Sequence, residues 1–337
     1  MFNIALIGFG AVGKSFAKLL KMKKDLLHDV NLKYIIKSDG GIYDENGLNI
    51  DELIEYINSD KKIQNHPMYS DISFKNILEN DDVDILIELT STNIVDGEPG
   101  YTHIRESLKN GLDVVTGNKG PILLHYNELK NLANKNNLYL KIGCTTGGAL
   151  PSVNAGTIDV LGAQVMEITG VLNGTTNFIL EEMLKNKVEY EEALKKAQDL
   201  NIAEKDPSLD VLGYDTAVKM AILSKVIWNI DFDFDKLDIN GITNVKLNDL
   251  LSADFSNDKV KLVGRASYLD GNFEFEVKPT VINSDHPLYS VDGKNKGVHY
   301  KTDILGDITV TGGASSPLNA AAAILRDLLY IIENRRW

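Results

Sequence analysis

The chain of 337 residues is poor in cysteine, in basic residues and in long apolar runs, and each shortage excludes a class of protein. A single cysteine rules out an intramolecular disulfide framework and fits a reducing compartment. A formal net charge of −13 argues against a nucleic acid or an anionic membrane as partner. No run approaches the ~18 uninterrupted apolar residues of a membrane span, and no basic segment followed by an apolar one opens the chain. We therefore expect a cytoplasmic protein without a secretory signal.

The first residues carry a glycine-rich turn between a strand and a helix. Residues 1–7 are apolar, Gly8-Phe9-Gly10-Ala11-Val12-Gly13 follows at once, and apolar residues recur at helical spacing through 14–24. In this context the first glycine permits a tight turn, the second lets a pyrophosphate approach the backbone, and the third lets helix and strand pack closely. The helix N-terminus then offers N–H groups to the phosphates. The pattern predicts dinucleotide binding by residues 8–13.

Strands and helices alternate after this turn, which predicts a doubly wound parallel sheet. The expected strands are 31–37, 83–89, 113–116 and 138–142, and the expected helices are 50–58, 72–79, 103–110 and 123–136. Thr90-Ser91-Thr92 and residues 116–121 lie just past the C-terminal ends of strands, where such sheets bind ligands. The alternative for these polar residues is ordinary turn chemistry.

The choice between NAD and NADP depends on residues after the second strand. An acidic residue there binds the ribose 2′-hydroxyl of NAD, and a basic one accommodates the 2′-phosphate of NADP. Asp39 favours NAD, whereas Lys37, with Lys61 or Lys62, favours NADP. We expect the protein to use both cofactors.

A second region starts near Gly143. It contains an expected strand over 167–172, helices over 173–186 and 189–200, alternating strand segments over 260–281 with a turn at 270–272, and a strand over 308–311. A Gly312-Gly313-Ala314 loop follows, and then a helix with Ser316 as its cap and Pro317 as its first residue. The expected fold class is α/β: a dinucleotide-binding domain over 1–142, completed by 308–337, and an α+β substrate and dimerisation domain with an open mixed sheet over 143–307.

The stretch from Ala197 to Lys219 concentrates charged residues around a helix end, a loop and a helix start. Its carboxylates are Glu204, Asp206, Asp210 and Asp215. Asp215 and Lys219 are four residues apart, so they share one helix face. The apolar neighbours of Lys219 indicate a partly desolvated amine, which is suited to acid–base chemistry. The alternatives are a structural salt bridge and, for the four carboxylates taken alone, a divalent metal site.

Together these motifs resemble those of the homoserine dehydrogenase family, in order and over nearly the whole chain. The residues that carry the resemblance are Gly8–Gly13, Thr90, residues 118–121, 147–151 and 173–177, Ala197, Glu204, Asp206, Pro207, Asp210, Gly213, Asp215 and Lys219. Residues 97–103 look like those of the short members, and the C-terminal regulatory domain of the long members is not part of this sequence.

The resemblance implies reversible, nicotinamide-dependent hydride transfer between L-homoserine and L-aspartate 4-semialdehyde, in threonine, methionine and isoleucine biosynthesis. It also implies a homodimer. Catalytic roles fall on Lys219 and Lys119, with the acid–base group left open between them, and on Asp210 as an orienting residue. Glu204, Asp215 and Thr175 are the implied substrate ligands. Besides residues 8–13, the implied cofactor contacts are Asp39, Thr90, Ser91, Lys119, Asn201 and Gly312. A sodium-like cation is implied on the backbone carbonyls of Gly143, Thr146, Gly148 and Leu150.

Two residues depart from the family pattern. Asn201 stands where the family usually has glycine, and asparagine is the next residue to accept the left-handed conformation at a helix end. Ile202 stands where many members have an aromatic residue.

Two other functions are weighed against this one. Cys144, in Gly143-Cys144-Thr145-Thr146, resembles the nucleophile of aspartate-semialdehyde dehydrogenase, which also needs a histidine base. None of the six histidines lies in a motif of that kind, so a buried thiol at a strand end is the preferred interpretation. A catalytically silent dinucleotide-binding regulator predicts cofactor binding without turnover, and the lysine–carboxylate set argues against it.

Overall fold

The computed structural model describes residues 1–59, 61–313 and 315–335. The chain forms two compact units: Met1–Ala149 with the C-terminal segment from Ser316, and Leu150–Ser315. The chain thus returns to the first unit at Ser316 and not at the expected residue 308, because the intervening strand pairs within the second unit. Ala314 of the expected loop and residues 336–337 lie outside the described residues. Within the described ranges, no helix is long and apolar enough to cross a membrane.

The first unit is built on a sheet with the strand order β4-β3-β2-β1-β5-β6-β7. Its strands are β1 (Phe2–Ile7), β2 (Val30–Lys37), β3 (Gly40–Tyr43), β4 (Tyr69–Ser70), β5 (Ile85–Glu88), β6 (Asp113–Thr116) and β7 (Leu140–Lys141). Strands β2, β1, β5, β6 and β7 pair in parallel, as expected for a Rossmann-type sheet. The predicted α/β class with a parallel-dominated sheet is confirmed.

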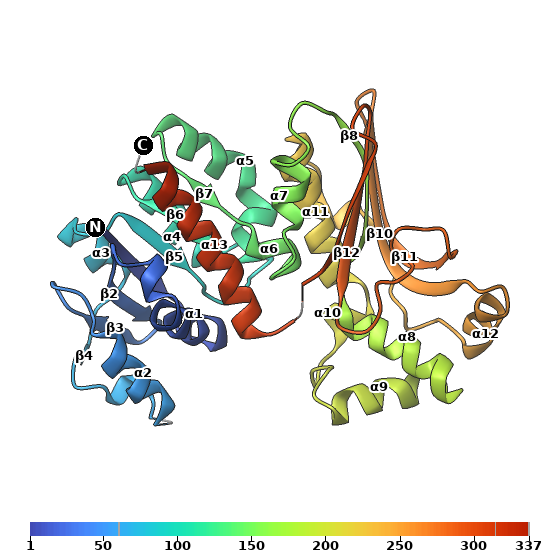
Figure 1. Ribbon diagram of the computed structural model, residues 1–337, viewed down its shortest axis with the longest axis horizontal. Helices are drawn as coiled ribbons and strands as arrows, with labels where there is room; N and C mark the ends of the chain where they lie inside the picture. Colours follow the sequence, from blue (N-terminus) through green and yellow to red (C-terminus); the bar gives the residue numbers. More distant parts are fainter. Residues whose placement is uncertain (60, 314, 336–337) are drawn as a thin grey trace. The chain divides into compact units, whose positions relative to one another are not determined.

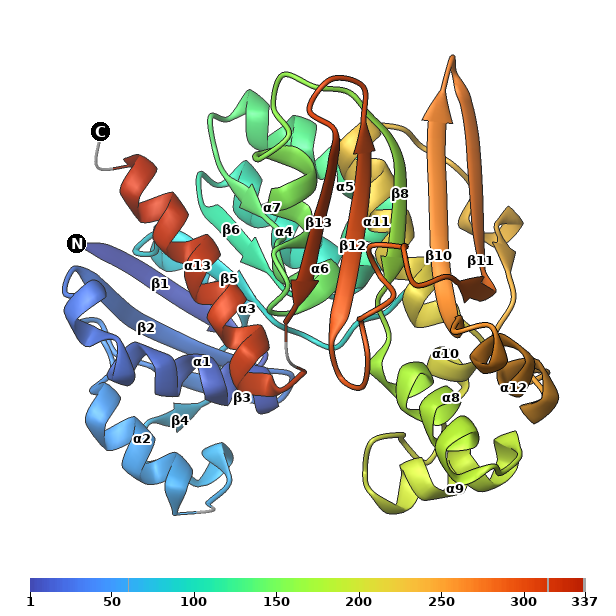
Figure 2. The ribbon, with the colours of Figure 1, turned by 45° about the vertical axis from the view of Figure 1, so that its right-hand side comes forward.

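Helices alternate with these strands. They are α1 (Ala11–Met22), α2 (Ile50–Asn58), α3 (Phe74–Asn80), α4 (Gly100–Lys109), α5 (Lys119–Lys135), α6 (Cys144–Gly147) and α13 (Pro317–Arg335), with 3₁₀ turns at Lys24–Leu26 and Ile63–Asn65. Figures 1 and 2 show α1 and α13 side by side, and both pack on the sheet through one apolar core. Phe16 of α1 and Leu328 of α13 are fully buried there. As predicted, Ser316 caps α13, accepting a hydrogen bond from the Asn319 N–H at 3.2 Å.

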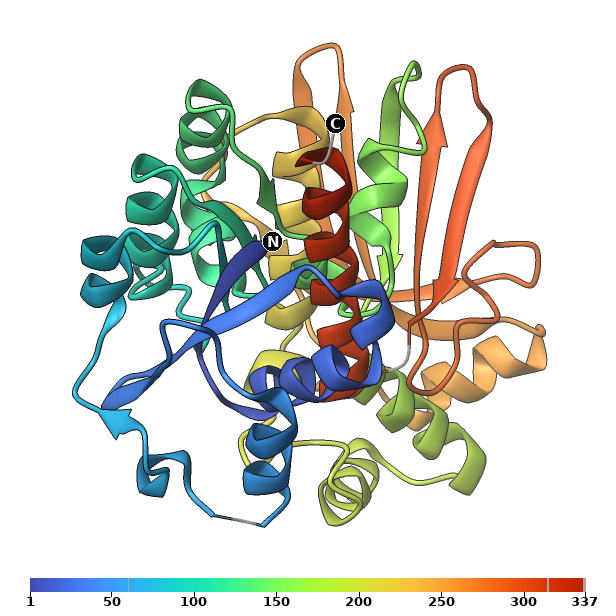
Figure 3. The ribbon, with the colours of Figure 1, turned by 60° about the vertical axis from the view of Figure 1, so that its left-hand side comes forward.

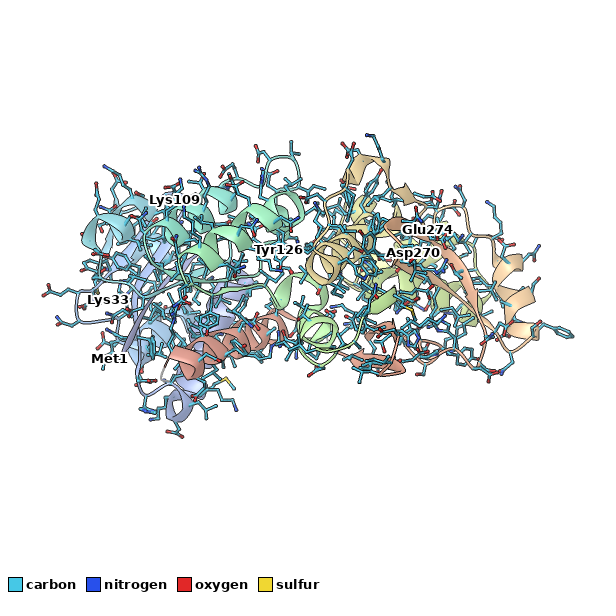
Figure 4. All side chains as sticks on the ribbon, turned by 90° about the horizontal axis from the view of Figure 1, so that it is seen from above. Met1, Lys33, Lys109, Tyr126, Asp270 and Glu274 are labelled. Carbon is cyan, nitrogen blue, oxygen red and sulfur yellow. The ribbon has the colours of Figure 1, made fainter. Side chains whose placement is uncertain are left out.

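Sequence periodicity did not predict the antiparallel edge formed by β3 and β4. The glycines at its start resemble a loop, but a Cβ at Gly41 would lie 2.3 Å from the Ile35 carbonyl oxygen, so glycine permits the strand pairing. Stacked rings of Tyr34 and Tyr43 hold the edge, and both hydroxyls donate to Asp82. Lys33, labelled in Figure 4, donates to the same carboxylate at 2.8 Å.

The second unit contains the predicted open mixed sheet, with the strand order β13-β12-β8-β10-β11-β9. Its strands are β8 (Val165–Val171), β9 (Asp238–Ile239), β10 (Lys259–Leu269), β11 (Asn272–Ile282), β12 (Lys296–Thr302) and β13 (Asp307–Gly312). Figures 2 and 3 show the hairpins β10–β11 and β12–β13 on opposite sides of β8. The first hairpin turns at Asp270 and Gly271, whose φ values of +51° and +83° suit a tight two-residue turn; Figure 4 labels Asp270.

The helices of the second unit are α7 (Ser152–Thr157), α8 (Gly174–Asn186), α9 (Tyr190–Asp199), α10 (Ser208–Val211), α11 (Tyr214–Trp228) and α12 (Leu247–Phe255), with a 3₁₀ turn at Phe234–Lys236. Gly170 and Gly264 are paired across β8 and β10, and Cβ atoms there would lie 2.9 and 2.4 Å from the Met220 side chain. Two glycines thus let α11, the helix that carries Asp215 and Lys219, approach the sheet closely.

Asp292 stabilises the second unit through two lysines of β10. Its carboxylate accepts hydrogen bonds from Lys259 and Lys261, each at 2.7 Å, and Lys261 also donates to the Val291 carbonyl at 2.6 Å. Lys261 is only 3% exposed, so removing its carboxylate partner leaves a buried ammonium poorly compensated. The Asp292 side chain is 43% exposed, and solvent therefore reduces the loss.

We expect Asp292→Asn to lower the free energy of unfolding by roughly 2 kcal/mol at pH 7. Burial alone raises the pKa of the Asp292 carboxyl, but hydrogen bonds from Lys259 and Lys261 outweigh burial and hold the pKa below its ordinary value. The stabilisation is therefore complete above about pH 4 and is lost as the pH falls through the lowered folded pKa. Urea unfolding of wild type and variant should converge in acid, whereas exposed Asp235→Asn should be neutral throughout. A difference between wild type and Asp292→Asn that persists in acid would contradict this account.

Candidate active site

The glycine-rich turn has the backbone that a dinucleotide site requires. Gly8 has a φ of +93°, and a Cβ there would lie 2.3 Å from the Leu89 carbonyl oxygen. A Cβ at Gly13 would lie 2.3 Å from the Gly8 carbonyl oxygen, whereas no described atom lies within 4 Å of the Cβ position at Gly10. The first and third glycines are thus needed by the turn, and the second leaves open space where a pyrophosphate fits.

The remaining residues of the turn contribute through their backbone. The Phe9 side chain is buried in the core of the first unit, so it is not available to a ligand. Ala11 and Val12 open α1, and the N-terminal N–H groups and positive dipole end of this helix suit phosphates.

A buried carboxylate, Glu88, organises the adjacent strand ends. It is fully buried at the last position of β5. One of its oxygens accepts hydrogen bonds from the backbone N–H (3.0 Å) and the hydroxyl of Thr90, and the other accepts from the Thr116 hydroxyl at 3.0 Å. Glu88 therefore connects the ends of β5 and β6, at the edge where the sheet is expected to bind its cofactor.

Asn118 extends this network to the predicted residues Thr90, Ser91 and Lys119. Its amide donates to the Thr90 hydroxyl at 3.0 Å and to the Ser91 carbonyl at 3.4 Å. Its side-chain oxygen accepts from the Gly120 N–H at 3.1 Å and caps α5. Lys119 is half-buried and is the first residue of α5. Because it lies between Asn118 and Gly120, which are hydrogen-bonded to each other, its backbone is held in place.

Asp39 lies in the turn after β2, as the cofactor prediction requires, and is exposed. Its carboxylate accepts hydrogen bonds from the Gln64 amide and the Tyr69 hydroxyl, each at 2.9 Å. These two bonds hold the pKa of the carboxyl below its ordinary value, so Asp39 is an anion at neutral pH.

Cys144 begins the short helix α6 and packs against the apolar core of the first unit. Its thiol lies 3.5 Å from the Ala320 carbonyl oxygen, and the residue is half-buried, so the thiol is less shielded than the sequence led us to expect. Gly143, before it, donates its N–H to the buried carboxylate of Asp327 at 2.7 Å. Burial raises the pKa of that carboxyl, against the effect of Arg326 and the Gly143 N–H.

The remaining residues of the predicted cation loop are also located. Thr146 is buried in α6, and Gly148 follows this helix with a φ of +61°. The carbonyl of Leu150, the first residue of the second unit, accepts a hydrogen bond from the Ser152 N–H at 2.8 Å.

In the second unit, Lys219, Asp215, Asp210 and Asn173 form one polar cluster. The Lys219 amine donates to the Asp215 carboxylate and, at 2.9 Å, to the Leu172 carbonyl. The Asn173 amide donates to Asp215 at 2.9 Å and to Asp210 at 2.6 Å. The Lys219 and Asp215 side chains are 12% and 14% exposed. The cluster can therefore hold a proton donor at a fixed point while staying open to a small molecule.

A cavity of about 260 Å³ contains Asp215 and Lys219 in its wall. Its other lining residues are Leu172, Asn173, Gly174, Thr175, Asn201, Ile202, Lys294, Lys296 and Ser315. The Thr175 hydroxyl donates to the Ile202 carbonyl at 3.2 Å. Asn201 has a φ of +53°, so the predicted left-handed residue after α9 is confirmed.

Of the predicted catalytic, substrate and cofactor residues of the second unit, Asp210, Glu204 and Gly312 do not line this cavity. Glu204 is exposed in the loop after α9. Gly312 ends β13, is half-buried and has a φ of +120°. Among the described residues, no three His, Cys, Asp or Glu side chains converge in a way that could hold a metal ion.

Sequence patterns did not identify Glu88, Lys294, Lys296 or Ser315 as site residues. The signal for Glu88 was a carboxylate at the end of an otherwise apolar buried strand, directly before Thr90. Lys294 lies just before β12 and Lys296 begins it, and because this strand was not predicted, no element placed these lysines near the cavity.

Comparisons with known proteins agree with this geometry. The family model of the homoserine dehydrogenase NAD-binding domain matches residues 8–142, and the homoserine dehydrogenase model matches residues 151–329. The homoserine dehydrogenase of Methanocaldococcus jannaschii is 36% identical over 99% of both chains. The NAD(+)-dependent homoserine dehydrogenase of Pseudomonas canavaninivorans is 32% identical over 98% of this chain and 96% of that one.

Solved structures give the same result. A hyperthermophilic archaeal homoserine dehydrogenase mutant in complex with NADPH superposes with a TM-score of 0.85 at 28% identity, covering 99% of this chain and 98% of that one. The two family models thus match successive parts of the chain, the first containing the glycine-rich turn and the second the Lys219–Asp215 pair. The chain belongs to the homoserine dehydrogenase family of nicotinamide-dependent oxidoreductases.

Proposed function

We propose that this protein catalyses the reversible oxidation of L-homoserine to L-aspartate 4-semialdehyde, a step in the biosynthesis of threonine, methionine and isoleucine. Family membership over the full chain supports this reaction. The observation that carries the proposal is the Lys219–Asp215 pair in the wall of a small polar cavity. A nicotinamide dinucleotide, when bound, supplies the acceptance and donation of a hydride.

Lys219 is proposed to exchange the proton of the reacting hydroxyl. Asp215 and the Leu172 carbonyl hold its amine at one place, so a substrate oxygen beside it is in reach of a proton donor or acceptor. Asn173 and Asp210 act as positioning residues, because the Asn173 amide bridges the two carboxylates and fixes Asp215. Lys119 is kept as the second candidate for this proton.

The substrate carries an ammonium group, a carboxylate and a hydroxyl, and the proposed ligands match these groups. Asp215 and Glu204 are assigned to the ammonium group, and Thr175 to a polar end of the substrate. Thr175 and Asp215 line the cavity, whereas Glu204 lies in the exposed loop after α9. Recognition by buried polar groups excludes analogues that lack them.

Both NAD and NADP are proposed as cofactors, bound by residues 8–13, Thr90, Ser91, Lys119, Asn201 and Gly312. The open space over Gly10 fits a pyrophosphate. Asp39 accepts two hydrogen bonds that hold it at the end of β2, where a carboxylate can bind a ribose 2′-hydroxyl and repels a 2′-phosphate. Lys37, at the end of the same strand, favours the phosphate.

We expect Asp39→Ala to change the preference from NAD toward NADP by roughly tenfold or more. The KM for NAD should rise because the 2′-hydroxyl loses its acceptor, while the KM for NADP should stay constant or fall. The measurement is initial rates with each cofactor at saturating homoserine, and Asp51→Ala, an exposed carboxylate of α2, is the control. An unchanged NAD/NADP ratio would remove Asp39 from the cofactor site.

Three further proposals concern the environment of the enzyme. A homodimer is proposed through the face of the second sheet opposite α11, where Arg265 of β10 pairs with Glu167 of β8. Light scattering of the protein in solution measures the mass of the assembly and tests this proposal. A sodium-like cation is proposed on the carbonyls of Gly143, Thr146, Gly148 and Leu150, since carbonyl oxygens suit hard cations. The composition supports a cytoplasmic location.

The reaction is tested by absorbance of the reduced nicotinamide, with L-homoserine and either NAD or NADP. Homoserine-dependent reduction and formation of the semialdehyde support the proposal. Reduction that instead requires aspartate semialdehyde and phosphate, and that thiol alkylation abolishes, would favour the Cys144 enzyme. Cofactor binding without turnover of either substrate would favour a silent regulator.

A further inference from the structure

The cavity wall carries positive charge besides that of Lys219, and proton exchange with the substrate does not account for it. Besides Lys219, its wall contains Lys294 and Lys296. Lys294 is exposed, but Lys296 is only 7% exposed. Lysine ammonium groups in a cavity wall offer charged donors to an anionic group of a ligand.

The strand geometry determines the direction of Lys296. It is the first residue of β12, and alternation puts it on the same face as Val298 and Tyr300. The Tyr300 hydroxyl donates to the Ser152 carbonyl, next to α7, at 2.6 Å. Val298 pairs with Gly170 of β8, and Gly170 faces the side chain of Met220 in α11. Val298 therefore lies on the sheet face that α11 covers. Lys296 therefore points to the face that α11 covers, the face that holds the cavity.

The loop before Lys296 is fixed against the start of α8. A Cβ at Gly174 would lie 3.2 Å from the Lys294 Cα, so glycine allows this approach. Gly174 and Thr175 line the same cavity, and the positive end of the α8 dipole adds to the charge of the two lysines. The cavity wall thus combines two lysines and a helix N-terminus with the carboxylate of Asp215.

We propose that Lys296 binds the carboxylate of the amino-acid substrate and determines specificity for an amino acid over an amino alcohol. This inference rests on the proposed function, which supplies a substrate with one ammonium group and one carboxylate. Asp215 and Lys296 recognise the two charges separately, and the reacting hydroxyl is directed to Lys219. Lys296 is a binding residue and takes no part in the proton transfer.

The test compares Lys296→Met with wild type in homoserine oxidation at saturating cofactor. A lost charge-assisted hydrogen bond should raise the KM for L-homoserine roughly 30-fold or more, with kcat within a few-fold and the cofactor KM unchanged. Competitive inhibition separates this role from a structural one. Inhibition by L-2-aminobutyrate, which retains both charged groups, should weaken by the same factor, whereas inhibition by 3-aminopropan-1-ol, which lacks the carboxylate, should not change.

Two variants serve as controls. Lys296→Arg keeps the charge and should retain much of the L-2-aminobutyrate inhibition. Lys195→Met removes an exposed lysine of α9 that does not line the cavity, and it should behave as wild type. Lys296→Gln replaces the methionine variant if that variant does not fold.

An unchanged homoserine KM, or equal weakening of both inhibitors, would overturn the assignment of Lys296. A wild type that does not oxidise homoserine would instead overturn the proposed function, so the two failures are distinguishable within one assay.

Discussion

Lys219→Ala is expected to lower kcat for homoserine oxidation by roughly 10²–10⁴, the usual contribution of a general acid–base group. The variant should still fold, because Asp215 keeps its hydrogen bond from Asn173 at 2.9 Å. Cofactor affinity should be unchanged, because Lys219 is not among the proposed cofactor contacts and the glycine-rich turn belongs to the other compact unit. The measurements are steady-state rates and fluorescence titration with the reduced cofactor.

Parallel variants separate catalysis from structure. Lys195→Ala, an exposed lysine of α9, is the control for removing a positive charge near the site's helices. If Lys219→Ala loses thermal stability but keeps its turnover, the Lys219–Asp215 pair is a structural ion pair. If Lys219→Ala keeps its turnover and Lys119→Ala does not, the acid–base role belongs to Lys119.

Glu88→Gln is expected to destabilise the protein by roughly 3 kcal/mol and to weaken cofactor binding at least tenfold. The carboxylate accepts three hydrogen bonds from two threonines while fully buried. An amide places an N–H donor against these donors, and leaving buried polar groups unsatisfied is costly. The ends of β5 and β6 then lose the group that connects them, and Thr90, Asn118 and Lys119 shift with them.

Thermal unfolding and cofactor titration measure both consequences of Glu88→Gln. The control is Glu79→Gln, which removes an exposed carboxylate paired with Lys75 and should change stability by less than about 0.5 kcal/mol. Wild-type stability together with wild-type cofactor affinity in Glu88→Gln would show that the network is dispensable.

Local patterns predicted most of the elements that support the site. Helix α2 matches its expected bounds, and β6 does as well, because each is bounded by clear polar or turn signals. Helix α5 begins at Lys119 and not at the expected residue 123. Its cap is Asn118, and Pro121 lies in the first turn, where a missing N–H costs little.

Long-range pairings were beyond the reach of periodicity. Strand β4 consists of two residues, Tyr69 and Ser70, which form a strand only because they pair with β3. Strand β12 has Lys296, His299 and Lys301 among its seven residues, so its apolar alternation is weak. Its partners β8 and β13 determine its conformation.

In the site too, local contacts were predictable from the sequence and long-range contacts were not. Asp215 and Lys219 are i,i+4 neighbours, so their contact was predictable from the sequence. Asn173 lies 42 residues from Asp215, and only the packing of α11 on β8, the strand just before Asn173, brings its amide to that carboxylate. The place of Lys296 in the cavity wall likewise depends on the pairing of β12 with β8.

The most direct test of the central claim is isotope transfer from homoserine to the nicotinamide. L-homoserine carrying deuterium at C4 is oxidised by the protein with NAD and, separately, with NADP, and the reduced cofactor is analysed by mass spectrometry. The account predicts one deuterium in each reduced nicotinamide and the semialdehyde in equal amount. Reduced cofactor without deuterium, or no reduced cofactor although the protein binds it, would contradict the assignment of this chain as a homoserine dehydrogenase.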